Sequence, residues 1–305
     1  MGLMELRGTQ KRKAVAKVKT FLMASVVVTL WGSSFVLTKI ALDEIGPVGI
    51  AFYRWFWAAL FFALFLGWQR RLGEIREALK HDFLAFTLLG LIGITLFYIF
   101  QNLGVQYSTA VNVGLIINLV SVFIAVLSVI YLKERIGALT ALGIFVAFLG
   151  VSLVSWQKGS LELSSRYLLG DLLTVLAALC GAIYTVWGKR VVARYAPLVV
   201  TALAAGFGAL FLFPLALAEG LVTSASPQAW LAILALGLGG GALANLWWWT
   251  ILETTEASRA GVYLLTIPIV STLLGILVLH EPFVFQTAIG AALVLGGVAL
   301  TQRAG

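Results

Sequence analysis

Residues 83–114 read FLAFTLLGLIGITLFYIFQNLGVQYSTAVNVG, and residues 230–261 read WLAILALGLGGGALANLWWWTILETTEASRAG. The second stretch follows the first at a constant distance of 147 positions, without a gap, and the same register continues toward the end of each half. The residues that recur in register are Gly90/Gly237, Gly93/Gly240, Ala110/Ala257, Gly114/Gly261, Glu134/Glu281, Gly143/Gly290 and Gly150/Gly297. Glycines alone could coincide in an apolar sequence, but a long ungapped register that includes a glutamate indicates an internal repeat.

Composition places the chain in a membrane. Of its 305 residues, 61% are hydrophobic and only 11% are charged, whereas soluble domains average about 25% charged residues. Many apolar runs approach the ~20 residues that a membrane helix requires, and no alternating apolar and polar pattern recurs as it would in a membrane barrel. The predicted spans are 20–42, 47–68, 83–103, 109–131, 138–156, 168–188, 197–219, 230–251, 257–279 and 284–301.

Five spans in each half require the second half to be inserted upside down relative to the first. Inverted repeats of this kind are a transporter architecture, with the site between the halves near mid-membrane. The predicted fold is therefore an all-α membrane protein with ten transmembrane helices in two inverted five-helix repeats. The predicted parts are a basic arm (1–19), a first repeat (20–156), an external linker (157–167) and a second repeat (168–301).

Basic residues predict the orientation. With ten spans, the basic arm and the loops that contain Arg71, Lys133 and Arg194 all fall on one side. Because basic loops stay cytoplasmic, both termini are predicted in the cytoplasm of a multi-pass protein of the cell (inner or plasma) membrane. The net charge of +8 then reflects topology and contact with anionic lipid. A nucleic-acid partner is not expected, because the charge is scattered among short loops. Within the loop at 69–82, a short interfacial helix is predicted.

Several motifs carry a family resemblance. They are Trp31-Gly32-Ser33-Ser34-Phe35, Tyr53-Arg54-Trp55, Ser108-Thr109-Ala110, Leu132-Lys133-Glu134-Arg135, Glu256-Ala257-Ser258-Arg259-Ala260 and Leu279-His280-Glu281-Pro282. With them the chain resembles the drug/metabolite transporter superfamily, EamA type, and its ten-helix aromatic amino-acid exporters. The resemblance implies two inverted repeats, a central cavity between them and export of small metabolites.

The repeat also predicts local structure. The first copy has Ser121 where the second has Pro268, so only the ninth span is predicted to kink there. The recurring glycines of the fifth and tenth spans predict close helix packing. Glu134 and Glu281 are predicted to cap the fifth and tenth helices, which they precede.

The candidate substrate site rests on polar and aromatic residues within spans. Asn245, Trp248 and Trp249 share a helix face, whereas Trp247 points elsewhere and suits an interfacial anchor. Interfacial anchoring also remains open for Trp249, but polar groups within a membrane usually face the bundle interior. Aromatic rings with a few hydroxyl and amide groups suit planar, amphipathic ligands. The candidate substrate-binding residues are Trp31, Ser34, Arg54, Tyr98, Asn102, Asn118, Tyr184, Trp187, Asn245, Trp248 and Tyr263.

Arg54 admits two interpretations. An unpaired charge about two turns inside a span is costly, which favours a structural partner such as Asp43 or Glu44, or extension of the side chain to the interface. The alternative is a contact with a substrate carboxylate.

Other functions find little support. The sequence has no phosphate loop and no zinc-binding helix, so no catalytic residue, metal or cofactor is expected. Cys180 is the only cysteine, which excludes an intrachain disulfide. A channel-like pore and a proton-coupled drug antiporter remain alternatives to a carrier, and a monomer is expected. No acidic residue lies near the middle of a predicted span, which favours facilitated diffusion or exchange.

Overall fold

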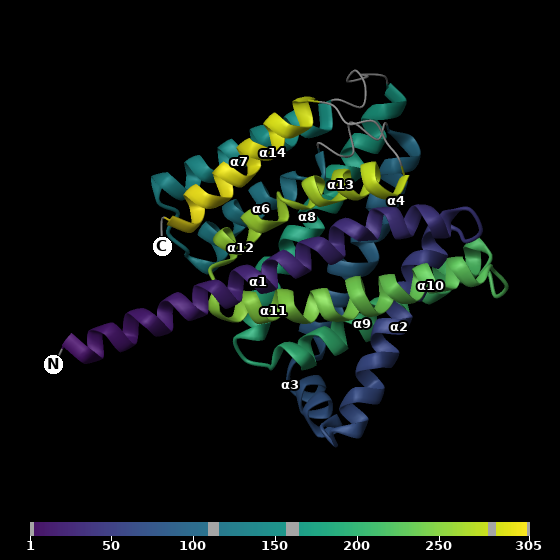
Figure 1. The fold of residues 1–305 in the computed structure, drawn as a ribbon. Coiled ribbons are helices and arrows are strands. Elements are labelled where there is room, and N and C mark those ends of the chain that lie inside the picture. Colours follow the sequence, from purple (N-terminus) through teal and green to yellow (C-terminus); the bar gives the residue numbers. More distant parts are fainter. Residues whose placement is uncertain (1–2, 109–115, 157–164, 280–284, 304–305) are drawn as a thin grey trace.

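The computed structural model describes residues 3–108, 116–156, 165–279 and 285–303, which contain helices and no strand. In the first half these are α1 (Leu3–Leu42), α2 (Pro47–Trp68), α3 (Leu72–Gly90), η1 (Leu91–Leu96), α4 (Phe97–Tyr107), α6 (Leu119–Leu127), η2 (Ser128–Leu132) and α7 (Ala138–Trp156). In the second half they are α8 (Ser165–Val192), α9 (Pro197–Glu219), α10 (Pro227–Ala235), η3 (Leu236–Leu243), α11 (Ala244–Thr254), α12 (Ala257–Leu264), α13 (Ile267–Leu279) and α14 (Phe285–Arg303). The start of α1 projects from the helix bundle (Figure 1).

The helices account for the predicted spans. Within the described residues, seven helices are long and apolar enough to cross a membrane. Shorter apolar helices at Leu119–Leu132, Ala138–Leu153 and Ala288–Thr301 coincide with the predicted fourth, fifth and tenth spans. The all-α membrane fold is confirmed.

A glycine seam between α7 and α14 reveals how the two halves are related. The two helices lie side by side (Figure 1) and contact each other over much of their length. A Cβ atom at Gly143 would lie 2.6 Å from the carbonyl oxygen of Gly297, and one at Gly150 would lie 2.6 Å from that of Gly290. Gly143 is equivalent to Gly290 in the repeat, and Gly150 is equivalent to Gly297. The Gly143–Gly297 and Gly150–Gly290 contacts are therefore related by the two-fold symmetry of the repeats. Because this pairing is antiparallel, the repeats are inverted, and the predicted close packing is confirmed.

The third and eighth spans share a feature that the sequence did not predict. In each, the α-helix widens into a π-helical segment, η1 in the first repeat and η3 in the second. The two segments occupy overlapping positions in the repeat register. π-Helical turns often occur at functional sites. Here η3 brings its glycine-rich backbone, including Gly240, against Arg54 of α2.

The predicted asymmetry at Pro268 is wrong. The ninth span breaks between α12 and α13, just before the proline, as predicted. However, the fourth span also breaks, in a turn at Ile117 and Asn118 immediately before α6. There the Ser121 hydroxyl group donates to the carbonyl oxygen of Gly261 in α12, at 2.9 Å. A contact between the repeats therefore accompanies the break in the copy that lacks the proline.

The loop at 69–82 is largely helical, as predicted. The helix α3 begins at Leu72 and continues toward the third span, with its backbone turned at Asp82 (φ −135°). The Asp82 carboxylate accepts hydrogen bonds from Arg194 at 3.1 Å and from Tyr195 at 2.6 Å. The turn in α3 is thus fixed by residues of the second repeat. The end of the bundle that carries Arg71, Lys133 and Arg194 is called the basic end below.

Orientation can be tested with single cysteines. Gly73 is exposed at the basic end, and Ser224 is exposed in the loop before α10. In a Cys180→Ala background, an impermeant thiol reagent applied outside intact cells should label Ser224→Cys and leave Gly73→Cys unlabelled, because basic loops are retained in the cytoplasm. Labelling at position 73 alone would reverse the predicted topology.

Candidate functional site

The backbone carbonyl group of Gly240 is the centre of a buried polar cluster. It accepts a hydrogen bond from the indole nitrogen of Trp31 at 3.1 Å and one from the side-chain amide of Asn245 at 2.9 Å. The Asn245 amide oxygen accepts in turn from the Tyr184 hydroxyl group at 3.4 Å. These residues belong to α1, η3, α11 and α8, so the cluster joins both repeats.

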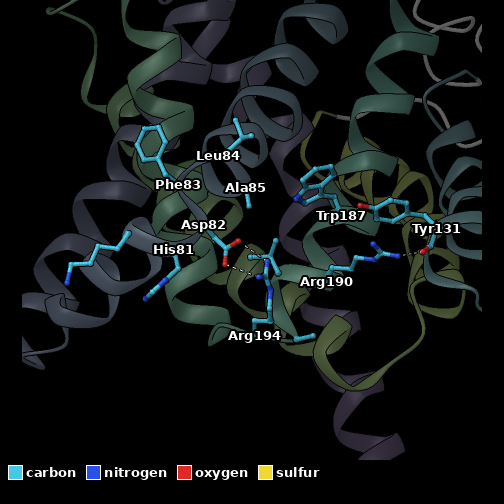
Figure 2. Close-up of a pocket in the computed structure, with 12 residues that line it drawn as sticks. His81, Asp82, Phe83, Leu84, Ala85, Tyr131, Trp187, Arg190 and Arg194 are labelled. Carbon is cyan, nitrogen blue, oxygen red and sulfur yellow. Dashed lines mark hydrogen bonds and ion pairs between the residues drawn. The ribbon is translucent and has the colours of Figure 1, made fainter.

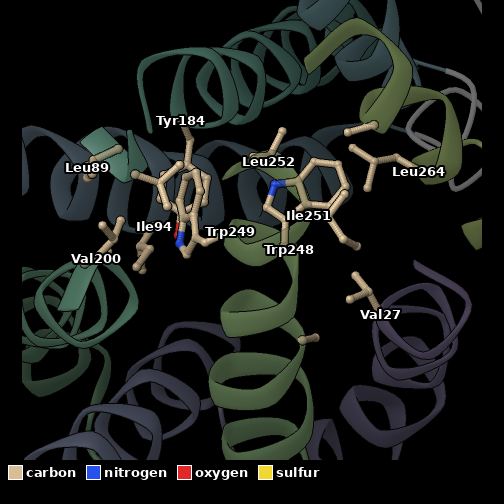
Figure 3. Packing of buried hydrophobic residues seen from close by; sticks show 14 of the residues in the cluster. Val27, Leu89, Ile94, Tyr184, Val200, Trp248, Trp249, Ile251, Leu252 and Leu264 are labelled. Atoms are coloured by element: carbon tan, nitrogen blue, oxygen red, sulfur yellow. The ribbon is translucent and has the colours of Figure 1, made fainter. Parts of the chain in front are cut away.

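The three consecutive tryptophans have different surroundings. Trp248 packs against Trp31 with ring centroids 5.6 Å apart, and Trp249 packs against Tyr184 at 4.7 Å. Both Trp248 and Trp249 are fully buried and face the interior (Figure 3). Trp247 is half-buried and lines a shallow apolar groove beside Val18, Leu22 and Val26 of α1. Burial excludes an interfacial anchor role for Trp249, whereas the position of Trp247 is compatible with one.

Arg54 reaches the same cluster from α2. It is only 7% exposed, and its guanidinium carbon lies 5.5 Å from the centre of the Tyr98 ring. A Cβ atom at Gly240 would lie 2.7 Å from the Arg54 Nη2 atom and 3.0 Å from the Ser34 hydroxyl oxygen. Only a glycine at position 240 allows this approach. The cluster therefore contains seven of the eleven candidate residues: Trp31, Ser34, Arg54, Tyr98, Tyr184, Asn245 and Trp248.

The remaining candidates lie elsewhere. Asn102 donates from its amide nitrogen to the carbonyl oxygen of Pro47 at 3.2 Å, at the start of α2. Trp187 lies toward the basic end, where it stacks on Tyr131. Asn118 and Tyr263 are buried at the breaks of the fourth and ninth spans.

A cavity of about 820 Å³ opens near the basic end, between α3, η2 and α8. Arg190 lies over the Tyr131 ring, 3.7 Å from its centre, and Tyr131 stacks on Trp187 at 6.3 Å (Figure 2). Across the cavity, Arg194 forms an ion pair with Asp82 at 2.9 Å. The hydrogen bond from Tyr195 to Asp82 raises the pKa of the Tyr195 hydroxyl group. Tyr131 and Arg190 were not candidates from sequence, where the arginine counted only as a topology signal.

Aromatic side chains of α8 and α11 pack between this cavity and the central cluster. Trp187 lines the cavity, and Tyr184 lies one turn away on α8. The Trp249 ring packs on both Tyr184 and the backbone at Gly188. The Tyr184–Trp249 pair thus lies between the cavity and Asn245.

At the end opposite the basic end, carboxylates join the two repeats. Glu219 of the second repeat accepts from the backbone amides of Val48 at 3.1 Å and Gly49 at 2.8 Å, and so caps α2 of the first repeat. Glu44 of the first repeat accepts from the backbone amide of Ser226 at 2.6 Å, at the start of α10 in the second. The Ser226 hydroxyl and amide groups lower the pKa of Glu44. Glu44, a predicted partner of Arg54, is therefore engaged elsewhere.

At the basic end, Glu134 caps a helix of the other repeat. It accepts from the backbone amides of Ala257 at 2.7 Å and Ser258 at 3.0 Å, and from the Ser258 hydroxyl group at 2.8 Å. The cap role was predicted, but the helix is α12 and not the following α7. Nearby, Lys189 donates to the carbonyl oxygens of Leu252 at 2.9 Å and Thr255 at 2.5 Å. The equivalent residue Glu281 lies outside the described residues.

Comparison with known proteins gives a consistent result. Residues 18–156 and 168–303 each match the model of the EamA-like transporter family. Two proteins of Archaeoglobus fulgidus, each described as an uncharacterized transporter, are 32% identical to the chain. The first match covers 93% of this chain and 97% of the relative, and the second covers 94% and 99%. The uncharacterized transporter YyaM of Bacillus subtilis is 31% identical over 88% of each chain. A crystal structure that is 20% identical matches with a TM-score of 0.82 over 94% of this chain and 97% of the other, which shows the same fold.

Proposed function

This chain belongs to the EamA-like transporter family and is a membrane transporter, and from this premise we propose that it exports small amphipathic metabolites, above all amino acids with aromatic or other apolar side chains. The observation that carries the proposal is the buried cluster at Gly240, where hydrogen-bonding and aromatic side chains of both repeats converge. Such a lining suits a planar ligand held by ring contacts and a few hydrogen bonds. Contacts of this kind between inverted repeats are where transporters bind their substrates.

Alternating access is the mechanism that these contacts favour. Glu44 and Glu219 join the repeats at one end, and a cavity opens at the other. Rotation of the Tyr184–Trp249 pair away from Gly188 would connect this cavity with Asn245. Release of the two carboxylate caps would then open the opposite end. Because the side chains of the central cluster pack closely, the bundle favours a carrier over a pore. Substrate would then reach the central cluster from only one side of the membrane at a time.

Transport is expected not to require protons. Five described carboxylates next to the spans lie at the span ends: Glu44, Glu134 and Glu219 cap helices, Asp82 pairs with Arg194, and Asp171 accepts from Ser108. Proton-driven transporters commonly titrate a carboxylate or histidine inside the membrane. An imposed proton gradient across proteoliposomes should therefore leave the steady-state uptake of a labelled substrate unchanged. Proton-driven accumulation that is lost in Asp171→Asn would reverse this proposal.

Asn245 offers a direct test of the site. Asn245→Leu keeps the side-chain volume but removes the hydrogen bonds to Gly240 and Tyr184, and the loss of one such interaction costs about 1–3 kcal/mol. Transport of labelled phenylalanine into proteoliposomes should fall about tenfold or more. The control Trp247→Leu changes the half-buried neighbour two residues away, keeps an apolar side chain there and removes no hydrogen bond of the cluster, so it should alter transport less than Asn245→Leu does. Equal loss in both variants would place the site elsewhere.

A further inference from the structure

In the described part of the chain, the buried side-chain atoms without a hydrogen-bond partner are all N–H donors. Among the described residues they are Arg54 Nε and the indole nitrogens of Trp55, Trp57 and Trp249. Three of the four, from Arg54, Trp55 and Trp57, lie within one turn of α2. Trp55 faces Tyr98 of α4, whereas Trp57 packs on Gly237 of η3, so the two indole rings lie on different sides of α2, and Arg54 is the donor placed at Gly240. An unpaired buried donor is costly, and the charged Arg54 side chain therefore indicates a site for an acceptor.

Two backbone acceptors of the cluster are already in use. The Gly240 carbonyl oxygen accepts from Trp31 and Asn245, which occupies both of its lone pairs. The Leu30 carbonyl oxygen accepts from the hydroxyl groups of Ser33 and Ser34, in addition to its place in the helix. The Tyr98 ring offers a cation–π contact, but it cannot accept the in-plane hydrogen bonds of a guanidinium group. Arg54 Nε is left without a hydrogen-bond acceptor among the described residues.

No carboxylate of the described residues compensates the charge of Arg54. Glu44 and Glu219 cap helices at the end opposite the basic end, and Glu134 caps α12 at the basic end. The repeat does not duplicate the charge either, because alignment of Pro47 with Pro197 places Ala204 at the position of Arg54. Among the described residues, Arg54 is the one buried cation, and it faces the contact between the repeats. A buried charge of this kind is usually paired or functional.

We infer that the central site recognises an anionic carboxylate through Arg54, so that the substrates are aromatic or other apolar carboxylates and their amino group is dispensable. The inference rests on the proposed function and narrows its substrate class. A carboxylate supplies the acceptor that Arg54 Nε lacks, and Trp31 and Trp248 provide an apolar wall for the rest of the molecule. An ammonium group would meet donors and a positive charge, with no described carboxylate to pair with.

Three ligands with the same phenyl ring and different charged groups separate the contributions of the carboxylate and the ammonium group to binding. 3-Phenylpropionate carries only the carboxylate, 2-phenylethylamine carries only the ammonium group, and phenylalanine carries both. Binding to the purified wild-type protein is measured at pH 7.5 by the change in tryptophan fluorescence, which does not depend on transport. We expect 3-phenylpropionate to bind at least as tightly as phenylalanine, and 2-phenylethylamine to bind more than about tenfold more weakly, because charge-assisted hydrogen bonds are worth that much or more.

Variants then assign the effect to Arg54. Arg54→Gln should weaken the binding of 3-phenylpropionate by about tenfold to a hundredfold and leave that of 2-phenylethylamine unchanged or stronger. Arg54→Lys keeps the charge and should retain part of the preference. Arg71→Gln removes the same charge from the basic end, where Arg71 pairs with Glu74, and is the control.

The outcomes distinguish the inference from the function on which it rests. Equal binding of the amine and the acid by the wild-type protein, or failure of the acid to bind, overturns the carboxylate site whatever the variants show. Saturable transport without preference for the acid also overturns the carboxylate site, but it leaves the carrier intact. Absence of saturable transport of every solute would instead overturn the carrier.

Discussion

Gly297→Val is expected to unfold the protein at a much lower temperature than the wild type, because position 297 has no room for a side chain. A Cβ atom there would lie 2.6 Å from the backbone nitrogen of Ala147 and 2.7 Å from its Cβ atom. The backbones of α7 and α14 would have to separate along the seam. Overpacking of this kind costs about 1–3 kcal/mol, and occasionally more, when the obstacle is backbone. Thermal unfolding in detergent, followed by circular dichroism, measures the change.

Gly296→Val is the matched control. Gly296 is the preceding residue of the same helix, but it is exposed, and no atom lies within 4 Å of a Cβ built there. Both variants change the helix propensity of α14 equally, so the difference between them isolates the seam. Equal melting temperatures would contradict the packing of α14 on α7.

Glu134→Ala is expected to impair both stability and transport. Its carboxylate satisfies the amides of Ala257 and Ser258 at the start of α12 and also accepts from the Ser258 hydroxyl group. Loss of a helix cap costs about 0.5–2 kcal/mol, and each unpaired amide that remains buried adds about 1–3 kcal/mol. The ninth span would lose its link to the first repeat at the basic end. Thermal unfolding and transport by proteoliposomes are measured on the same preparation.

Glu253→Ala provides the comparison, since it removes an exposed carboxylate from the end of α11 without disturbing a cap. It should change the melting temperature little. Glu134→Gln should retain part of the stability, because its amide oxygen can still accept from one backbone amide. If Glu134→Ala and Glu253→Ala behave alike, Glu134 does not hold the repeats together.

The order of the spans and the inverted repeat could be predicted because both depend on patterns that are visible in the sequence itself. Apolar length defines a span, and the register of Gly143 and Gly150 with Gly290 and Gly297 anticipates a two-fold seam. The partner of Glu134 could not be predicted in the same way. Its side chain reaches across the repeats to α12, and sequence proximity to α7 was misleading.

The central site was predictable in part. Residue type and depth within a span singled out Trp31, Arg54 and Asn245, which the structure brings to Gly240. The sequence did not distinguish Gly240 from the neighbouring glycines, because the role of Gly240 depends on the π-helical segment η3. Asn102 shares its repeat position with the buried Trp249, yet it contacts Pro47 at the end of the bundle. The repeats are therefore equivalent in backbone and different in the side chains that form the site.

Counterflow tests the central claim, that the two repeats form a carrier with one site between them. Proteoliposomes loaded with unlabelled phenylalanine are diluted into trace labelled phenylalanine, with ionophores present to remove ion gradients. A carrier with alternating access should accumulate the label transiently above its external concentration, and Asn245→Leu should reduce this overshoot about tenfold or more. Entry of the label that never exceeds the external concentration, whatever the internal load, would contradict the account.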